Sequence, residues 1–129
     1  LDVNDFKRIN DVHGHAAGDA VLCEIARRLK ECVRETDTVA RMGGDEFTVL
    51  LTDIHSKETA MEKAAQLLDA LVTNEKSGTP SIGMPSCSVG VAIYPEDGKS
   101  ADALLHYADV NMYRMKRQRG RSSSAMLKR

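Results

Sequence analysis

The sequence has no tryptophan and few other aromatic residues, so that aromatic side chains occupy only 4% of its 129 positions. Domains that bind single-stranded nucleic acid stack bases on aromatic side chains, and we therefore expect no nucleic-acid partner. No apolar run approaches the roughly 20 residues of a membrane-spanning helix, and no signal peptide opens the chain. These absences disfavour a nucleic-acid-binding or membrane-embedded domain.

Cysteine is also scarce. Cys23, Cys32 and Cys87 cannot all pair with one another, and none has the close spacing of a metal-binding motif. Because disulfides are rare in the cytosol, we interpret them as reduced core thiols of a cytoplasmic domain. Apolar residues make up 42% and charged residues 29%, which is typical of a globular protein, and the length suits a single domain covering residues 1–129.

The net charge is only −1, but basic residues gather at one end of the chain. From position 114 onward there are seven basic residues and no acidic one, whereas residues 1–113 carry 11 basic and 19 acidic side chains. A basic end of this kind can attract phosphate groups, although a solvated helix end would look the same.

Helical periodicity predicts three long helices and one short one. Residues 17–35 carry an apolar stripe, with Arg27 and Arg28 mostly off it, and Ser56 is a suitable N-cap for a helix that continues to Val72. A further helix starts at Ser100 and is expected to end at the GRSSS segment (residues 120–124). Residues 5–14 form a short helix or turn.

Strands are predicted on both sides of a glycine pair and again near residues 86–95. The segment ARMGGDEFTVLL (residues 40–51) has the character of a hairpin in which Gly43 and Gly44 supply the turn. Leu1 to Val3 resemble the end of a strand. With helices long enough to cover one sheet, this order predicts an α+β fold.

Acidic residues lie at the ends of two predicted strands, Asp2 on one and Asp45 and Glu46 on the other. If these strands are neighbours, the carboxylates converge at one edge of the sheet. Hard oxygen ligands suit Mg²⁺, which retains waters and shares its coordination with substrate phosphates. Exposed turn acids without a metal are the alternative on local evidence.

The string RMGGDEF (residues 41–47) contains the signature of the GGDEF family, the diguanylate cyclases. Three further segments resemble that family in order and spacing: LDVNDFKRINDVHGHAAGD (1–19), CSVGVAIYPEDG (87–98) and ADVNMYRMKRQRGR (108–121). The resemblance implies a palm-like fold, with a central, mostly antiparallel sheet flanked by helices, similar to nucleotidyl cyclases. It also implies the condensation of two GTP into cyclic di-GMP and two pyrophosphates, with Mg²⁺ or Mn²⁺.

The resemblance assigns roles to the acids. Asp2 and Asp45 are similar to the metal-binding carboxylates, and the carbonyl of Val3 completes the coordination. Glu46 resembles the second hairpin acid, either a metal-site residue or a base for the ribose 3′-hydroxyl. These two roles are not separated by the sequence, so the catalytic candidates are Asp45 and Glu46.

Substrate-binding positions follow from the same resemblance. Asn10 and Asp19 match the pair that reads guanine, and Gly43 and Gly44 let the nucleotide approach the hairpin. The remaining candidates are groups that would contact phosphate: the backbone amides of Asp5, Phe6 and Lys7, the side chain of Lys116, and Arg121. One extra residue in the last motif leaves Arg119 and Arg121 as alternatives for that final contact.

The family also carries an inhibitory site. Arg34 and Asp37 have the RxxD pattern at the expected offset from Gly43, which implies binding of cyclic di-GMP as product inhibitor. The family usually begins earlier, so we expect a chain shortened at its N-terminus. Catalysis across a homodimer and control by regulatory domains of a parent protein, which membrane segments could anchor, are implied as well. A catalytically inactive module that binds GTP or cyclic di-GMP is the alternative.

Overall fold

Four helices surround a small sheet in the computed structural model, which describes the backbone of residues 1–127 and the side chains of residues 1–118. The elements follow one another as β1 (Asp2–Val3), α1 (Phe6–His13), α2 (His15–Cys32), β2 (Thr38–Gly43), β3 (Glu46–Leu50), α3 (Lys57–Val72), β4 (Cys87–Ser88) and α4 (Ala101–Leu127). In the described part of the chain, no helix is both long enough and apolar enough to span a membrane.

The sheet has the strand order β2-β3-β1-β4, and each neighbouring pair is antiparallel. The short β1 is therefore an inner strand, with Asp2 opposite Glu46 on one side and Ser88 on the other. An antiparallel sheet flanked by helices confirms the predicted α+β fold.

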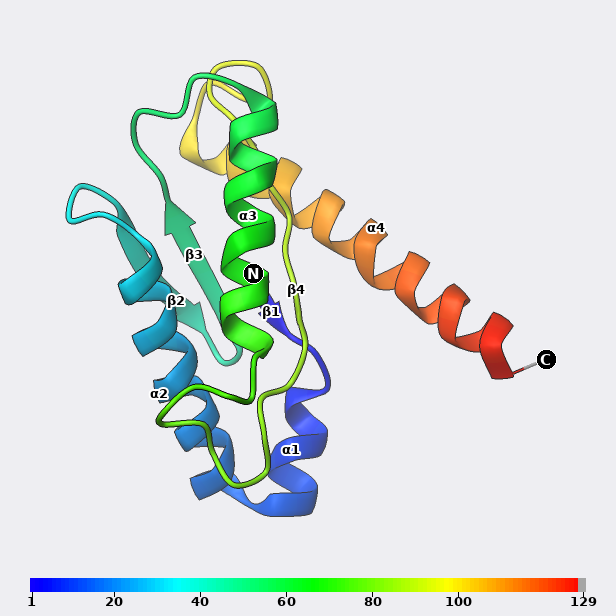
Figure 1. Ribbon diagram of the computed structural model, residues 1–129. Helices are drawn as coiled ribbons and strands as arrows, with labels where there is room; N and C mark the ends of the chain where they lie inside the picture. Colours follow the sequence, from blue (N-terminus) through cyan, green and yellow to red (C-terminus); the bar gives the residue numbers. More distant parts are fainter. Residues whose placement is uncertain (128–129) are drawn as a thin grey trace.

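The two faces of the sheet differ in polarity because side chains alternate along a strand. Val3, Phe47 and Cys87 are buried and belong to one apolar cluster with α2 and α3. Asp2 and Glu46, their neighbours in sequence, must point to the opposite face. That face is where α4 packs, since Lys116 on α4 contacts Asp2. In Figure 1, α2 and α3 lie in front of the sheet and α4 runs behind it.

The helices form as their sequences predict. Val21, Ile25 and Leu29 repeat at helical spacing on α2 and are fully buried. The Ser56 hydroxyl caps α3 by accepting a hydrogen bond from the backbone N–H of Thr59, which confirms the predicted cap.

Several boundaries differ from the prediction. The α2 helix ends at Cys32 rather than at residue 35, because a tight turn follows in which Arg34 N–H donates to the Asp37 carboxylate. The two-residue hairpin turn is Gly44–Asp45 rather than Gly43–Gly44, since Gly43 still pairs with Glu46. Gly44 alone of the two glycines has a positive φ, +36°.

The predicted ends of the last strand and the last helix are also wrong. The ladder of β4 stops at Ser88, because α4 packs closely beyond it: a Cβ at Gly90 would lie 1.7 Å from the Ala108 carbonyl oxygen. The α4 helix continues through the GRSSS segment to Leu127. One glycine in a helix interior costs only about 1 kcal/mol, which is too little to end it. Of the predicted core thiols, Cys87 is buried, Cys32 is half-buried and Cys23 is exposed.

Candidate active site

An acidic edge forms where β1 meets the β2–β3 hairpin. Asp2 and Glu46 are direct cross-strand partners, which places their Cβ atoms about 4.5–5.5 Å apart on the face covered by α4. Asp45 occupies the adjoining turn, and its carbonyl oxygen accepts a hydrogen bond from Val3 N–H at 3.2 Å. The turn that carries Asp45 is thereby fastened to the strand that carries Asp2.

Asp2 combines a strong ion pair with an unsatisfied oxygen. Its Oδ2 accepts a hydrogen bond from Lys116 Nζ at 2.6 Å. Its Oδ1 is buried and, among the side chains that the structure describes, is the one buried polar atom without a hydrogen-bond partner. An unpaired buried carboxylate oxygen is costly, and a cation at this point would relieve the cost.

These residues fit a divalent cation that is shared with a substrate. Within the described residues, no three acidic, histidine or cysteine side chains form a ready-made metal cluster. A Mg²⁺ site of one or two carboxylates completed by water and phosphate needs no such cluster. The orphaned Oδ1 of Asp2, with Glu46 opposite and Asp45 in the adjoining turn, supplies a donor set of that kind.

The start of α1 offers backbone donors next to this edge. Asp5 takes a left-handed conformation (φ +56°), and no described side chain caps the helix there. The first N–H groups of a helix have no partner within it, so the amides of Phe6 and Lys7 remain available to an anion.

Asn10 and Asp19 come from adjoining helices. Asn10 on α1 is half-buried and Asp19 on α2 is exposed. Gly18 lets α1 and α2 pack closely at this point, because a Cβ at Gly18 would lie 1.9 Å from Asn10 Oδ1 and 3.2 Å from the ring of Phe6. The signal for it was an isolated glycine in a helical pattern, which often marks close packing.

Asn4 joins β1 to the segment ahead of β4. Its amide nitrogen donates to Ser86 Oγ at 3.1 Å, and its amide oxygen accepts from Ser88 Oγ at 2.9 Å. A cavity of about 270 Å³ lies between α1 and this segment; its described lining includes Asn4, Asp5 and Arg8. The cavity therefore adjoins the start of α1 rather than the acidic edge.

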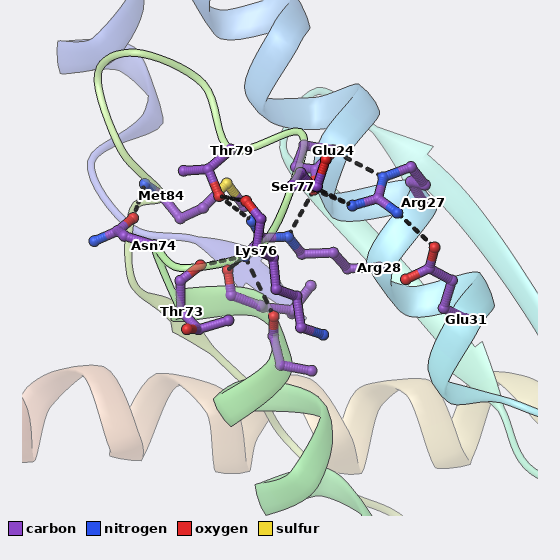
Figure 2. A network of polar contacts seen from close by, with 12 residues as sticks. Glu24, Arg27, Arg28, Glu31, Thr73, Asn74, Lys76, Ser77, Thr79 and Met84 are labelled. Atoms are coloured by element: carbon purple, nitrogen blue, oxygen red, sulfur yellow. Dashed lines mark hydrogen bonds and ion pairs between the residues drawn. The ribbon is translucent and has the colours of Figure 1, made fainter.

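A buried ionic network holds the loop between α3 and β4 (Figure 2). Arg28, predicted to lie off the apolar stripe of α2, is fully buried. Its guanidinium donates to Glu24, to the Thr79 hydroxyl and to the carbonyls of Leu71 and Thr73. The apolar periodicity of α2 could not reveal this role, because Arg28 is buried by polar contacts with a distant loop rather than by apolar packing.

Glu24 is the anion of this network. Hydrogen bonds from Arg27, and secondly from Arg28, outweigh the effect of burial and lower the pKa of Glu24 to about 2. Arg27 also donates to the Ser77 carbonyl at 2.9 Å. Two arginines on α2 thus fix the loop whose end carries Ser86.

The RxxD residues lie at the turn before β2. Asp37 has 1% of its side chain exposed, and its two oxygens accept from the backbone amides of Thr52 and Arg34, each at 2.9 Å. The Thr52 amide, followed by that of Arg34, lowers the pKa of Asp37. Arg34 has 55% of its side chain exposed and also donates to the Thr52 carbonyl.

The basic residues between positions 114 and 121 lie on α4. Lys116 lies against Asp2, as described above, and the Arg117 guanidinium lies 6.0 Å from the centre of the Tyr113 ring. The side chains of Arg119 and Arg121 lie outside the described part of the structure, so the choice between them stays open.

The antiparallel sheet, its acidic edge and the open start of α1 define an α+β domain whose polar face can hold a cation beside an anion. Among known families, residues 1–122 match the family described as "Diguanylate cyclase, GGDEF domain". The chain belongs to the GGDEF family.

Relatives with curated names support this assignment. The chain is 44% identical to "Diguanylate cyclase TpbB" of Pseudomonas aeruginosa over 92% of its length, and 40% identical to "Diguanylate cyclase A" of Treponema denticola over 99%. It is also 36% identical to "Cyclic di-GMP phosphodiesterase PdeR" of Escherichia coli over 90%. The chain spans only 27% of the first, 34% of the second and 17% of the third.

Solved structures agree. The GGDEF domain of TpbB (YfiN) from Pseudomonas aeruginosa aligns with a TM-score of 0.79 and 43% identity, over 91% of this chain and 73% of that one. The GGDEF domain of DgcB from Caulobacter crescentus, solved in complex with c-di-GMP, aligns with a TM-score of 0.75 and 26% identity, over 91% of this chain and 69% of that one. Both bear out the palm-like arrangement that the sequence implies.

Proposed function

We propose that this chain is the catalytic domain of a diguanylate cyclase, which condenses two GTP into cyclic di-GMP and two pyrophosphates. One observation carries the proposal: the cross-strand pair of Asp2 and Glu46, with Asp45 in the adjoining turn and one Asp2 oxygen buried without a partner. Carboxylates held this close together can bind a divalent cation.

Asp2 and Asp45 are the proposed metal ligands, with Glu46 and the Val3 carbonyl as further donors. A bound Mg²⁺ or Mn²⁺ would supply charge stabilisation for the α-phosphate and the leaving pyrophosphate. Glu46 is exposed and unencumbered by a described ion pair, so it is also free to accept the proton of the ribose 3′-hydroxyl. Asp45 is the alternative base, and both stay catalytic candidates.

GTP binding is proposed for the surface from α1 to the hairpin. The amides of Asp5, Phe6 and Lys7 would bind the β- and γ-phosphates, and the open start of α1 supports this. Asn10 and Asp19 would read guanine. Gly43 and Gly44 leave the hairpin backbone open, since a Cβ at either position would meet no described atom within 4 Å. Lys116 and Arg121 would complete the phosphate contacts.

We also propose a homodimeric, cytoplasmic enzyme under the control of further domains. Each 3′-hydroxyl must attack the other nucleotide, so two protomers have to face each other. Because the chain spans about a quarter of TpbB, regulatory domains of a parent protein are the natural source of that control, and membrane anchoring would reside there.

A second candidate is a binding module without turnover. The relative PdeR is named as a phosphodiesterase, so similarity over this segment does not by itself require cyclase activity. The intact acidic edge favours the cyclase, since a pure receptor has no need of three carboxylates at one edge.

Incubation with GTP and Mg²⁺, followed by chromatography of the products, tests the proposal. The parent chain should yield cyclic di-GMP, and Asp45→Ala should yield none while its melting temperature in metal-free buffer stays within a few degrees. GTP binding without product in the parent would favour the second candidate. A sharp fall in the melting temperature of Asp45→Ala would instead make Asp45 structural.

Product inhibition is proposed at Arg34 and Asp37. The exposed Arg34 fork can hold the phosphate and guanine edges of cyclic di-GMP. Asp37 holds Arg34 in place by accepting hydrogen bonds from the amides of Arg34 and Thr52 and from the Thr52 hydroxyl. Bound product would couple to catalysis through β2, which leads from this turn to the hairpin.

Calorimetry with cyclic di-GMP tests this site. Arg34→Ala should lose tight binding and relieve inhibition of GTP turnover, whereas Lys30→Ala removes an exposed cation near the end of α2, outside the motif, and should retain both. Equal cyclic di-GMP affinity in Arg34→Ala and the parent would contradict the inhibitory-site assignment.

A further inference from the structure

On the polar face of the sheet, the carboxylates of Asp2 and Glu46 outnumber the one lysine, Lys116, that pairs with Asp2. Asp2 and Glu46 are directly opposite each other, and like charges in that position destabilise a strand pair. Lys116 is the side chain that forms an ion pair with Asp2, at 2.6 Å from Oδ2, and it leaves Oδ1 without a hydrogen bond.

We propose that Lys116 is an exchangeable counter-ion of the metal site. It holds Asp2 while the site lacks a metal, and it transfers to the nucleotide phosphates when the metal and GTP arrive. This inference rests on the metal site in the proposed function. It assigns Lys116 two partners in succession and predicts that it opposes binding of the metal alone.

The side chain can make this exchange without movement of its helix. Lys116 has 34% of its side chain exposed and ends in a compact ammonium on a flexible stem, so rotation about its side-chain bonds is enough. Asp2, with 13% of its side chain exposed on an inner strand, cannot follow it.

The other end of α4 is fixed. Lys57 on α3 donates to the Asp97 carboxylate at 3.1 Å and to the Tyr107 hydroxyl of α4 at 3.1 Å. The Asn111 amide donates to the Val91 carbonyl at 3.4 Å. With two anchors before it, Lys116 is the adjustable contact between α4 and the sheet.

Two effects of opposite sign follow. A divalent cation that binds alone must compete with the ammonium for Asp2, which weakens its binding. A triphosphate gives the displaced ammonium a new partner, which strengthens binding of the metal and nucleotide together. Lys116 therefore couples the two ligands, and it disfavours a metal-filled site that lacks substrate.

The test measures Mn²⁺ binding to the 129-residue chain by electron paramagnetic resonance, first without nucleotide. Lys116→Met keeps the apolar stem and removes the charge. It should lower the Kd for Mn²⁺ by about twofold to fivefold, the range expected from release of a partly exposed ion pair. Lys99→Met is the matched control: it removes the same charge from an exposed site before α4, and about 22 Å of helix separates Ala101 from Lys116.

The second arm titrates a non-hydrolysable GTP analogue in the presence of Mn²⁺. Lys116→Met should bind the analogue more weakly than the parent, although it binds Mn²⁺ alone more tightly. Lys116→Arg retains the charge, so its affinities for Mn²⁺ and for the analogue should both stay close to those of the parent. Circular dichroism verifies that each variant is folded, and a variant that fails this test is replaced by Lys116→Gln.

Unchanged or weaker Mn²⁺ binding by Lys116→Met would overturn the proposal, as would tighter Mn²⁺ binding with unchanged affinity for the analogue. Absence of Mn²⁺ binding in both proteins would overturn it as well. None of these results depends on turnover, so failure of the cyclase proposal is detected separately by chromatography of the products from GTP.

Discussion

Replacement of Arg28 by methionine should destabilise the domain far more than the same change at its neighbour Arg27. Methionine retains most of the aliphatic volume and removes the guanidinium, so the change tests the polar contacts rather than packing. Arg28 has no exposed side-chain surface, whereas Arg27 has 44% of its side chain exposed.

The magnitude follows from the groups that lose a partner. Arg28→Met strips hydrogen bonds from the carbonyls of Leu71 and Thr73 and from the Thr79 hydroxyl. Each buried acceptor left unpaired costs about 1–3 kcal/mol, and breaking a buried ion pair costs about 3–5 kcal/mol. Glu24 keeps its hydrogen bonds from Arg27, which places the expected loss near 3–4 kcal/mol.

Urea unfolding followed by circular dichroism measures the difference. Domains of this size are stable by about 5–15 kcal/mol, so Arg28→Met should lower the urea midpoint by a large fraction, and Arg27→Met should cost about 1 kcal/mol or less. In the Glu24→Gln background, Arg28→Met should cost less, because the ion pair is already lost. Equal losses for Arg27→Met and Arg28→Met would refute the reasoning that burial makes Arg28 the structural clamp.

The remaining predictions concern the residues proposed to bind guanine and the loss of stability in acid. Gly18→Ala forces Asn10 from its position and should weaken GTP binding about tenfold by calorimetry, while the free energy of unfolding changes by less than about 1 kcal/mol. Asp19→Asn should weaken GTP binding by about 1–3 kcal/mol, and unchanged affinity would remove Asp19 from the guanine site. The pKa of Glu24 is lowered from 4.5 to about 2, so its contribution is complete above pH 4.5 and is lost as the pH falls toward 2. Glu24→Gln should therefore show a flatter loss of unfolding free energy across that interval than the parent.

Local signals were enough to predict much of the fold. The Ser56 cap, the apolar repeats of α2 and α3 and the strand-forming residues on both sides of the glycine pair are all local signals, and each element formed. The meeting of Asp2 with the hairpin acids was a conditional prediction. The direct pairing of Asp2 with Glu46 confirms the strand neighbourhood on which it depended.

Other features depend on contacts between distant segments. Arg28 is polar in sequence and buried in the fold, because its partners other than Glu24 lie more than 40 positions away. The end of β4 at Ser88 depends on how closely α4 approaches Gly90. The contact of Lys116 with Asp2 joins residues 114 positions apart, and the sequence could suggest only that Lys116 binds an anion.

Because side chains alternate along β1, a misaligned pairing of this strand would be unstable. Val3 belongs to the apolar core, and Asp2, its neighbour, lies on the polar face, where it pairs with Lys116. A shift of one residue in the pairing of β1 with β3 would place a carboxylate among the aliphatic side chains and a valine on the polar face. The misaligned chain would lose its core packing and the proposed metal ligand together. Any chain that folds stably therefore presents Asp2 on the polar face.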